Sequence, residues 1–265
     1  MKVISCIKPV PDPASRLIIN EAKTWIKDQE LTFVASEADN YALEEALRLK
    51  EKHGGEVVVL SLGGEEAARV LRSGLAMGAD RAIHLLDPKF KGSDEFAAAA
   101  ALARAIQKDG SADLVLAGVQ SDDLGTGMTG TMTAEFLGWA HATVVVGVEV
   151  QPDNKSLRAQ RELEGGINET VELTLPAVLT IQFGINHPRY ASLKGIMAAK
   201  KKEFKAWSAA DLELPDNAIG RAGATYDVTE VLFPERKSRV EIISGTPEEA
   251  AANLVEKLRK EAKVI

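Results

Sequence analysis

The sequence predicts an α/β fold built on a doubly wound, mostly parallel sheet. Short β-rich runs alternate with helical patterns through the first half of the chain, which is the order that produces such a sheet. Runs such as VVVLSL and LVLAG are almost entirely apolar, as burial on both faces of a sheet requires. Hydrophobic residues make up 45% of the 265 residues but aromatic residues only 5%, which favours helices packed closely on a sheet.

The alternation defines the expected elements of the first half. The expected strands cover residues 2–7, 56–62, 82–86 and 113–117. The expected helices are NYALEEALRLKEK, EEAARVLRSGLAMG and EFAAAAALARAIQK. Sheets of this kind bind ligands beyond the carboxyl ends of their strands, near the point where the strand order reverses. We therefore expect a binding site in the loops that follow the strands.

After Trp139 the pattern changes to four further β-type runs, ATVVVGVEVQ, SLRAQREL, ETVELTL and AVLTIQF. The turn-forming sequences PDN, EGG and LP separate them, which indicates a largely antiparallel addition to the sheet edge. From about Ile185 the periodicity weakens, and PDNAIGRAG and LFPERKS are typical of loops. We expect residues 1–184 to form the α/β domain and residues 185–265 to form an extended arm that packs on another surface.

A helix is predicted close to the C-terminal end of the sequence, in AAANLVEKLRKEAK. Thr246 is its expected N-cap, Pro247 occupies the first helical position, and Glu249 completes a capping box.

Composition argues against several classes of protein. The formal net charge of −7 disfavours a nucleic-acid binder held by phosphate contacts. Cys6 is the only cysteine, and the four histidines share no ligand spacing, so neither a disulfide nor a metal site is expected. No apolar stretch approaches the ~20 residues of a membrane span, and the apolar run in MKVISCIKPV is too short for a signal peptide. These features favour the cytoplasm without membrane insertion.

No catalytic site is expected either. The sequence has no Gly-x-Ser-x-Gly elbow, and Cys6 lies in a strand without an evident base. Asp122 and Asp123 are adjacent carboxylates, but acids that cap a turn are commoner than acid/base pairs.

The loop GVQSDDLGTGMTGT follows the LVLAG strand and leads into the helix MTAEFLGW. Its glycines allow close backbone approach, and its amides and hydroxyls face a helix N-terminus, which favours a phosphate site. The spacing matches neither GxGxxG nor a Walker A loop, so a glycine-rich turn without a ligand stays open. Similarly, SEADN precedes a helix, where Ser36 or Asp39 could be a helix cap or an adenosine contact.

The segment INHPRYASLKGIMAAKKK places an isolated leucine, Leu193, and a basic cluster on one short stretch. A scattered surface leucine beside a solvated helix face is one interpretation. A docking site, with one apolar anchor and charges that steer approach, is the other.

RELEGG, by itself, predicts a hairpin turn at Gly165 and Gly166 with charged strand residues around it. The longer run RELEGGINETVELTLPAVLT, followed by NHPRYASLKGIMAAKKK, resembles the β subunit of an electron transfer flavoprotein. The resemblance continues through ALEEALRLK, LAMGADRAIHL and AGVQSDD and covers almost the whole chain. It implies a Rossmann-like, adenine-nucleotide-binding fold in one half of a heterodimer. The α subunit would hold the redox FAD and this chain a structural AMP, while electrons pass from dehydrogenases to a quinone reductase or another acceptor.

The resemblance also implies site residues. The AMP contacts would be Cys6, Ser36, Glu37, Ala38, Asp39, Leu62, Gly118, Val119, Gln120, Ser121, Asp122, Asp123, Leu124, Gly125, Thr126, Gly127, Met128 and Thr129. Glu162 would face the flavin domain of the α subunit. The recognition loop for other partners would carry Pro188, Arg189, Tyr190, Leu193, Lys200, Lys201 and Lys202, with Leu193 as its anchor.

Two alternatives to this function stay open. One is an electron-bifurcating subunit with a second FAD, although the DTAQVGP-type run that resembles that branch is absent from LGTGMTGT. The other is a stand-alone domain that binds or hydrolyses ATP.

Overall fold

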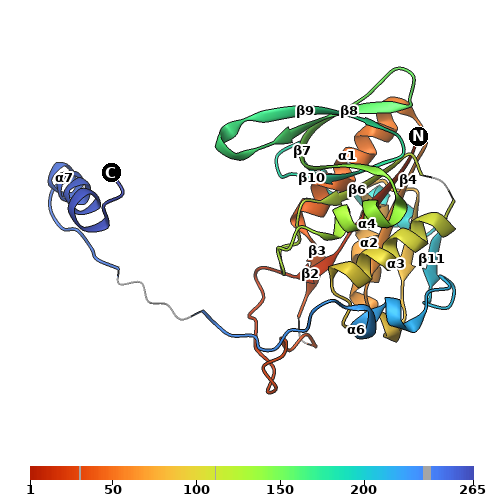
Figure 1. Cartoon of the computed structure of the whole chain (residues 1–265), viewed down its shortest axis with the longest axis horizontal. Coiled ribbons are helices and arrows are strands. Elements are labelled where there is room, and N and C mark those ends of the chain that lie inside the picture. The colour runs from red at the N-terminus through yellow and green to blue at the C-terminus, as the bar shows by residue number, and fades with distance from the viewer. Residues whose placement is uncertain (30, 111, 235–239) are drawn as a thin grey trace.

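The computed structural model describes residues 1–29, 31–110, 112–234 and 240–265. Helices cover both faces of a nine-stranded sheet, and the last part of the chain reaches away from it (Figure 1). The predicted α/β class with a doubly wound, mostly parallel sheet is confirmed. Within the described ranges, no helix is long and apolar enough to cross a membrane.

The strand order is β11-β5-β4-β1-β6-β10-β7-β8-β9. The strands of this sheet are β1 (Lys2–Cys6), β4 (Glu56–Leu62), β5 (Arg81–Leu85), β6 (Leu114–Gly118), β7 (Ala140–Val150), β8 (Ser156–Glu162), β9 (Asn168–Thr174), β10 (Ala177–Ile181) and β11 (Phe204–Trp207). From β11 to β7 all pairs are parallel, and β7, β8 and β9 pair antiparallel. The chain order reverses at β1, because β4 and β5 lie on one side of it and β6 on the other.

Two helices cover each face of the sheet. On one face α1 (Glu37–His53) and α2 (Glu65–Met77) share a core with Val3, Val57 and Val59. On the other, α3 (Glu95–Lys108) and α4 (Thr129–Leu137) share a core with Ile4, Val58 and Leu60. Since successive strand residues point to opposite faces, burial of both sets explains why these strands are apolar at almost every position.

The antiparallel addition is smaller than expected. The run AVLTIQF contains β10, which lies inside the sheet and pairs parallel with both β6 and β7. Its five residues are all buried, which is the pattern of a central parallel strand rather than an edge. Only β7 to β9 form the antiparallel edge, and their β8–β9 turn contains Gly165 and Gly166 as predicted. A second, two-stranded sheet of β2 (Pro9–Pro11) and β3 (Phe33–Ala35) was not predicted.

The boundary expected at residue 185 is too early. Helix α5 (Leu193–Ala199) packs on α2, and β11 extends the main sheet beside β5. Helix α6 (Gly220–Gly223) packs on α3, and Thr225 donates a side-chain hydrogen bond to Asp94 at 2.7 Å. The α/β domain therefore includes the chain as far as about residue 226.

Helix α7 (Pro247–Lys257) stands apart from the sheet (Figure 1). Its capping box between Thr246 and Glu249 is confirmed, and the helix continues as a π-helical turn, Leu258–Ala262. The predicted loop LFPERKS lies partly outside the described residues. Val240 and Ile242, which precede α7, are 87% and 84% exposed. Such an apolar segment is typical of a chain that packs on a partner.

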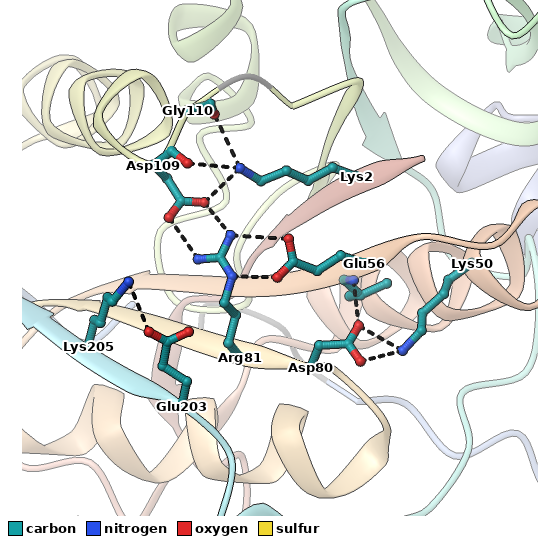
Figure 2. A network of polar contacts seen from close by, with 10 residues as sticks. Lys2, Lys50, Glu56, Asp80, Arg81, Asp109, Gly110, Glu203 and Lys205 are labelled. Carbon is teal, nitrogen blue, oxygen red and sulfur yellow. Dashed lines mark hydrogen bonds and ion pairs between the residues drawn. The ribbon is translucent and has the colours of Figure 1, made fainter.

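An ion-pair network joins the amino-terminal ends of the strands (Figure 2). Arg81 of β5 donates to both Asp109 carboxylate oxygens, at 2.7 and 2.6 Å, and pairs with Glu56 of β4. Lys2 of β1 reaches the same Asp109 carboxylate at 3.0 Å. The Asp109 side chain is only 6% exposed, so its charge depends on these cations.

Candidate functional site

A cleft opens at the carboxyl ends of β1, β4 and β6, where the strand order reverses. This is the location expected for a ligand in a doubly wound sheet. Of the predicted contact residues, the following line it: Cys6, Asp39, Leu62, Gly118, Val119, Gln120, Ser121, Leu124, Thr126, Gly127, Met128 and Thr129. Ser36, Glu37, Ala38, Asp122, Asp123 and Gly125 lie behind or beside this lining rather than in it.

Asp39 joins two of the loops around the cleft. It is buried in the first turn of α1, and its carboxylate accepts hydrogen bonds from the backbone N–H groups of Lys8 and Gly118, both at 2.8 Å. A Cβ atom at Gly118 would lie 2.6 Å from Cβ of Ala38, so this close approach requires glycine. Burial raises the pKa of Asp39 to about 7, although both hydrogen bonds oppose the shift.

This raised pKa predicts a pH dependence of stability. The unfolded carboxyl has a pKa of about 3.9, so between about pH 4 and pH 7 the folded chain holds the Asp39 proton and the unfolded chain releases it. The free energy of unfolding should therefore fall as pH rises through this interval, by at most about 1.4 kcal/mol per pH unit, and level off above it. Asp39→Asn cannot titrate, so urea unfolding at pH 5, 6 and 7 should show a flatter profile for the variant. Parallel profiles would contradict the assignment.

The adjacent carboxylates of the glycine-rich loop fix its position. Asp122 accepts from the backbone N–H of Glu37 at 2.7 Å and from the Ser36 hydroxyl at 3.2 Å. Ser36 is the N-cap residue of α1, yet the side-chain oxygen that bonds the first turn belongs to Asp122. Asp123 pairs with Lys8 at 2.7 Å. These contacts support the capping interpretation of the two carboxylates over an acid/base pair.

The loop itself has the backbone that its glycines allow. Gly125 and Gly127 adopt φ of +64° and +67°, a conformation that other residues rarely take. The loop from residue 122 to 128 is exposed and ends at the N-terminus of α4, where unpaired backbone N–H groups favour an anion. Among the described residues that line the cleft, Lys8 is the one cationic side chain.

Sequence reasoning missed Lys8 and Glu95 as cleft residues. Glu95, in the first turn of α3, accepts from the Thr126 hydroxyl at 2.9 Å and from the Tyr226 hydroxyl at 2.7 Å. Its sequence environment, EFAAAA, gave only a helical signal. It joins the glycine-rich loop to the last part of the α/β domain, and that contact is visible only once the fold is known.

Cys6 ends β1 at the wall of the cleft. Burial and the nearby Asp39 charge raise the pKa of its thiol to about 12. The thiol therefore stays protonated near neutral pH and is a poor nucleophile.

The 185–202 segment lies away from the cleft and presents the exposed apolar side chains that the sequence indicated. Tyr190 is 98% and Leu193 83% exposed. Arg189 and Lys202, in contrast, make contacts within the chain. Arg189 pairs with Glu44 and Glu51 of α1, and Lys202 donates to the Leu75 and Ala79 carbonyl oxygens near the end of α2.

The other predicted partner-contact residues are accessible to different degrees. Lys200 and Lys201 are exposed, and Pro188 is half-buried. Glu162 lies exposed at the end of β8 and accepts a hydrogen bond from the Gln182 amide at 3.0 Å.

Comparison with known proteins gives a consistent result. Residues 24–212 match the family described as electron transfer flavoprotein domain. The chain is 38% identical over 258 residues to electron transfer flavoprotein subunit beta of Methylophilus methylotrophus, covering 97% of each chain. It is 40% identical over 259 residues to the protein of the same name from Thermoanaerobacterium thermosaccharolyticum, covering 97% of this chain and 98% of the relative. It is also 36% identical over 262 residues to the caffeyl-CoA reductase-Etf complex subunit CarD of Acetobacterium woodii, covering 98% of each.

Proposed function

The chain belongs to the β-subunit family of electron transfer flavoproteins, and on that premise we propose that it binds AMP in the cleft as a structural nucleotide. In this proposal the redox FAD lies mainly in an α subunit, with which the chain forms a heterodimer. The pair carries electrons from dehydrogenases to a quinone reductase or another acceptor. The chain contributes no catalytic site of its own, which agrees with the protonated thiol of Cys6.

The arrangement of the cleft carries the nucleotide proposal. Backbone N–H groups at the start of α4 and the hydroxyls of Ser121 and Thr129 suit a phosphate. Apolar side chains of Leu62 and Leu124 suit the face of a purine. Carboxylates at the cleft wall suit ribose hydroxyls and an exocyclic amine, both of which are hydrogen-bond donors.

A glycine substitution tests this site. Gly127→Ala forces a side chain into a positive-φ position where its Cβ would lie 3.2 Å from the Val119 carbonyl oxygen. We expect about tenfold weaker AMP binding, and hence a lower melting temperature, because AMP stabilises only the folded state. The matched control is Gly138→Ala, with φ of +69° and no atom within 4 Å of the added Cβ. It carries the same backbone strain outside the cleft and should keep its AMP. Equal AMP contents in the two variants would contradict the site.

The main competing function is an electron-bifurcating subunit with a second FAD in the cleft. The similarity to a subunit of a caffeyl-CoA reductase-Etf complex is the observation that favours it. The count of flavins in the purified heterodimer separates the two: one FAD and one AMP support the proposal, and two FAD overturn the AMP assignment. A stand-alone ATP-binding domain has less support, because the similarity to three proteins named as subunits covers 97–100% of the chain.

Two surfaces account for the proposed partners. The α subunit covers the exposed apolar residues before and within α7, among them Val240 and Ile242. The 185–202 segment docks dehydrogenases. Leu193 enters an apolar pocket of the dehydrogenase, and the exposed Lys194, Lys200 and Lys201 favour an acidic rim around that pocket.

A further inference from the structure

Arg189 attaches the 185–202 segment to α1. Its Nε and Nη2 atoms donate to the two Glu44 carboxylate oxygens at 2.8 and 3.0 Å. Its Nη1 and Nη2 atoms donate to Glu51 at 2.6 and 3.2 Å. Glu44 and Glu51 lie about two turns apart on α1, so one planar guanidinium bridges both carboxylates.

The Glu44 end of this bridge is buried. The Glu44 side chain is 4% exposed. Burial alone would raise its pKa, but the hydrogen bonds from Arg189 hold the pKa below its usual value. Next to it, the buried Asn186 donates to the Tyr41 carbonyl oxygen at 3.0 Å and to Glu45 at 3.1 Å. The beginning of the segment is therefore held on α1 at two successive points.

The end of the segment is held on α2 instead. Ala199 is buried, and Lys202 donates to the Leu75 carbonyl oxygen at 2.9 Å. A Cβ at Gly195 would lie 2.2 Å from the Ala76 carbonyl oxygen, so α5 approaches α2 more closely than any other residue would allow. Between these two attachments lie the exposed apolar side chains, Tyr190, Leu193, Ile196 and Met197.

We propose that Arg189 is a positioning residue for docking: its bridge to Glu44 and Glu51 fixes Leu193 in the orientation that a partner dehydrogenase receives. The inference rests on the docking role proposed above for the segment. In this proposal the Arg189 charge does not contact the partner, because N–H groups on both edges of the guanidinium already pair with Glu44 and Glu51. Its contribution is that the segment is ordered before the encounter rather than during it.

Loss of the bridge should therefore weaken docking without changing the electron-transfer step. Ordering one side chain or a short loop at an interface costs enough to change an affinity about three- to tenfold. For the complete heterodimer with Arg189→Met, we expect the KM of a dehydrogenase for the heterodimer to rise by about that factor, with kcat unchanged. Amide hydrogen exchange should become faster over residues 188–199, and reduction of the flavin by dithionite should not change.

A double-mutant comparison separates positioning from direct contact. If Arg189 acts through Leu193, then Arg189→Met should raise KM less than twofold once Leu193 is alanine. The matched control is Arg104→Met. Arg104 also ties a later segment to a helix, through the Leu212 carbonyl oxygen and Glu213, but lies outside the docking segment. It should leave KM and the exchange of residues 188–199 unchanged.

Arg189→Lys is a second variant for the case in which Arg189→Met does not fold. Lysine retains a charge for the buried Glu44 but cannot bridge both carboxylates. It should give intermediate exchange and an intermediate KM. Unchanged exchange over residues 188–199, or faster exchange with an unchanged KM, would overturn the positioning role. The positioning role would also be overturned if Arg189→Met raised KM by the same factor in the wild-type and in the Leu193→Ala background. If Leu193→Ala alone has no effect on KM, the docking role fails and the positioning role fails with it.

Discussion

Replacing Leu193 with alanine is expected to raise the KM of a partner dehydrogenase for the heterodimer about ten- to a hundredfold. The side chain is 83% exposed in the chain alone, so nearly all of its apolar surface is available for burial by a partner. Burial of a leucine side chain contributes about 1.5–3 kcal/mol, which corresponds to that change in affinity. The FAD content, the AMP content and the flavin potential should not change, because the 185–202 segment is outside the cleft.

The measurement is steady-state reduction by a dehydrogenase beside reduction by dithionite. Leu17→Ala is a suitable control, since Leu17 is another exposed leucine, at 44%, and lies outside the docking segment. It should behave as wild type in both assays. If Leu193→Ala accepts electrons from the dehydrogenase as well as wild type does, the anchor role is wrong.

Arg81→Met is expected to lower the free energy of unfolding by about 3–5 kcal/mol. The substitution leaves the buried Asp109 carboxylate with Lys2 as its remaining cationic partner in the network (Figure 2) and leaves Glu56 without its arginine. Removal of one partner from a buried ion pair is destabilising by this amount, because the other charge stays desolvated. The melting temperature should fall by roughly 6–20 °C for a chain of this size. Arg158→Met, which breaks an exposed pair with Glu172, should cost no more than about 1 kcal/mol.

The pH dependence identifies Asp109 as the cause. Burial raises the pKa of Asp109, but the hydrogen bonds from Arg81 and Lys2 outweigh burial and hold it below its usual value. A carboxyl with a lowered folded-state pKa contributes stability above its unfolded pKa, about 3.9, and loses it as the pH falls through the folded value. In Arg81→Met the folded-state pKa of Asp109 is higher, because the hydrogen bonds from Arg81 are lost. The difference between wild type and Arg81→Met should therefore be constant near neutral pH and shrink as the pH falls through the Asp109 pKa of the folded variant. A difference that stays constant to pH 3 would mean that lost packing, not charge, is responsible.

The sequence predicted the parallel core because its signals are local. Whether a run in the first half forms a strand or a helix depends on the pattern of its own apolar side chains, which the sequence shows directly. Helix α3, for example, matches its predicted run from Glu95 to Lys108. The positions of β10 and β11 could not be predicted in this way. AVLTI has the same composition whether it pairs at an edge or in the centre, and FKAW joins the sheet only because β5 offers a free edge.

The candidate site shows the same division. The loops that the switch-point rule selected line the cleft, since that rule concerns where strands end. The roles of Lys8, Asp122 and Arg189 depend instead on partners far away in the chain, such as Asp123, Ser36 and Glu44. Charged residues near such loops give no sign in the sequence of whether they face solvent, a ligand or each other.

The bridge from Arg189 to α1 has a consequence for the transfer of docking specificity between relatives. A segment equivalent to 185–202 moved into another scaffold would bring its arginine but not the carboxylates, because Glu44 and Glu51 lie on a helix well over a hundred residues earlier. In a recipient without acids at both positions, the grafted arginine would be unpaired and the leucine would be presented by a loosely held loop. If the positioning role proposed for Arg189 holds, a functional chimera requires the α1 carboxylates as part of the transplanted unit, although they are distant in the sequence.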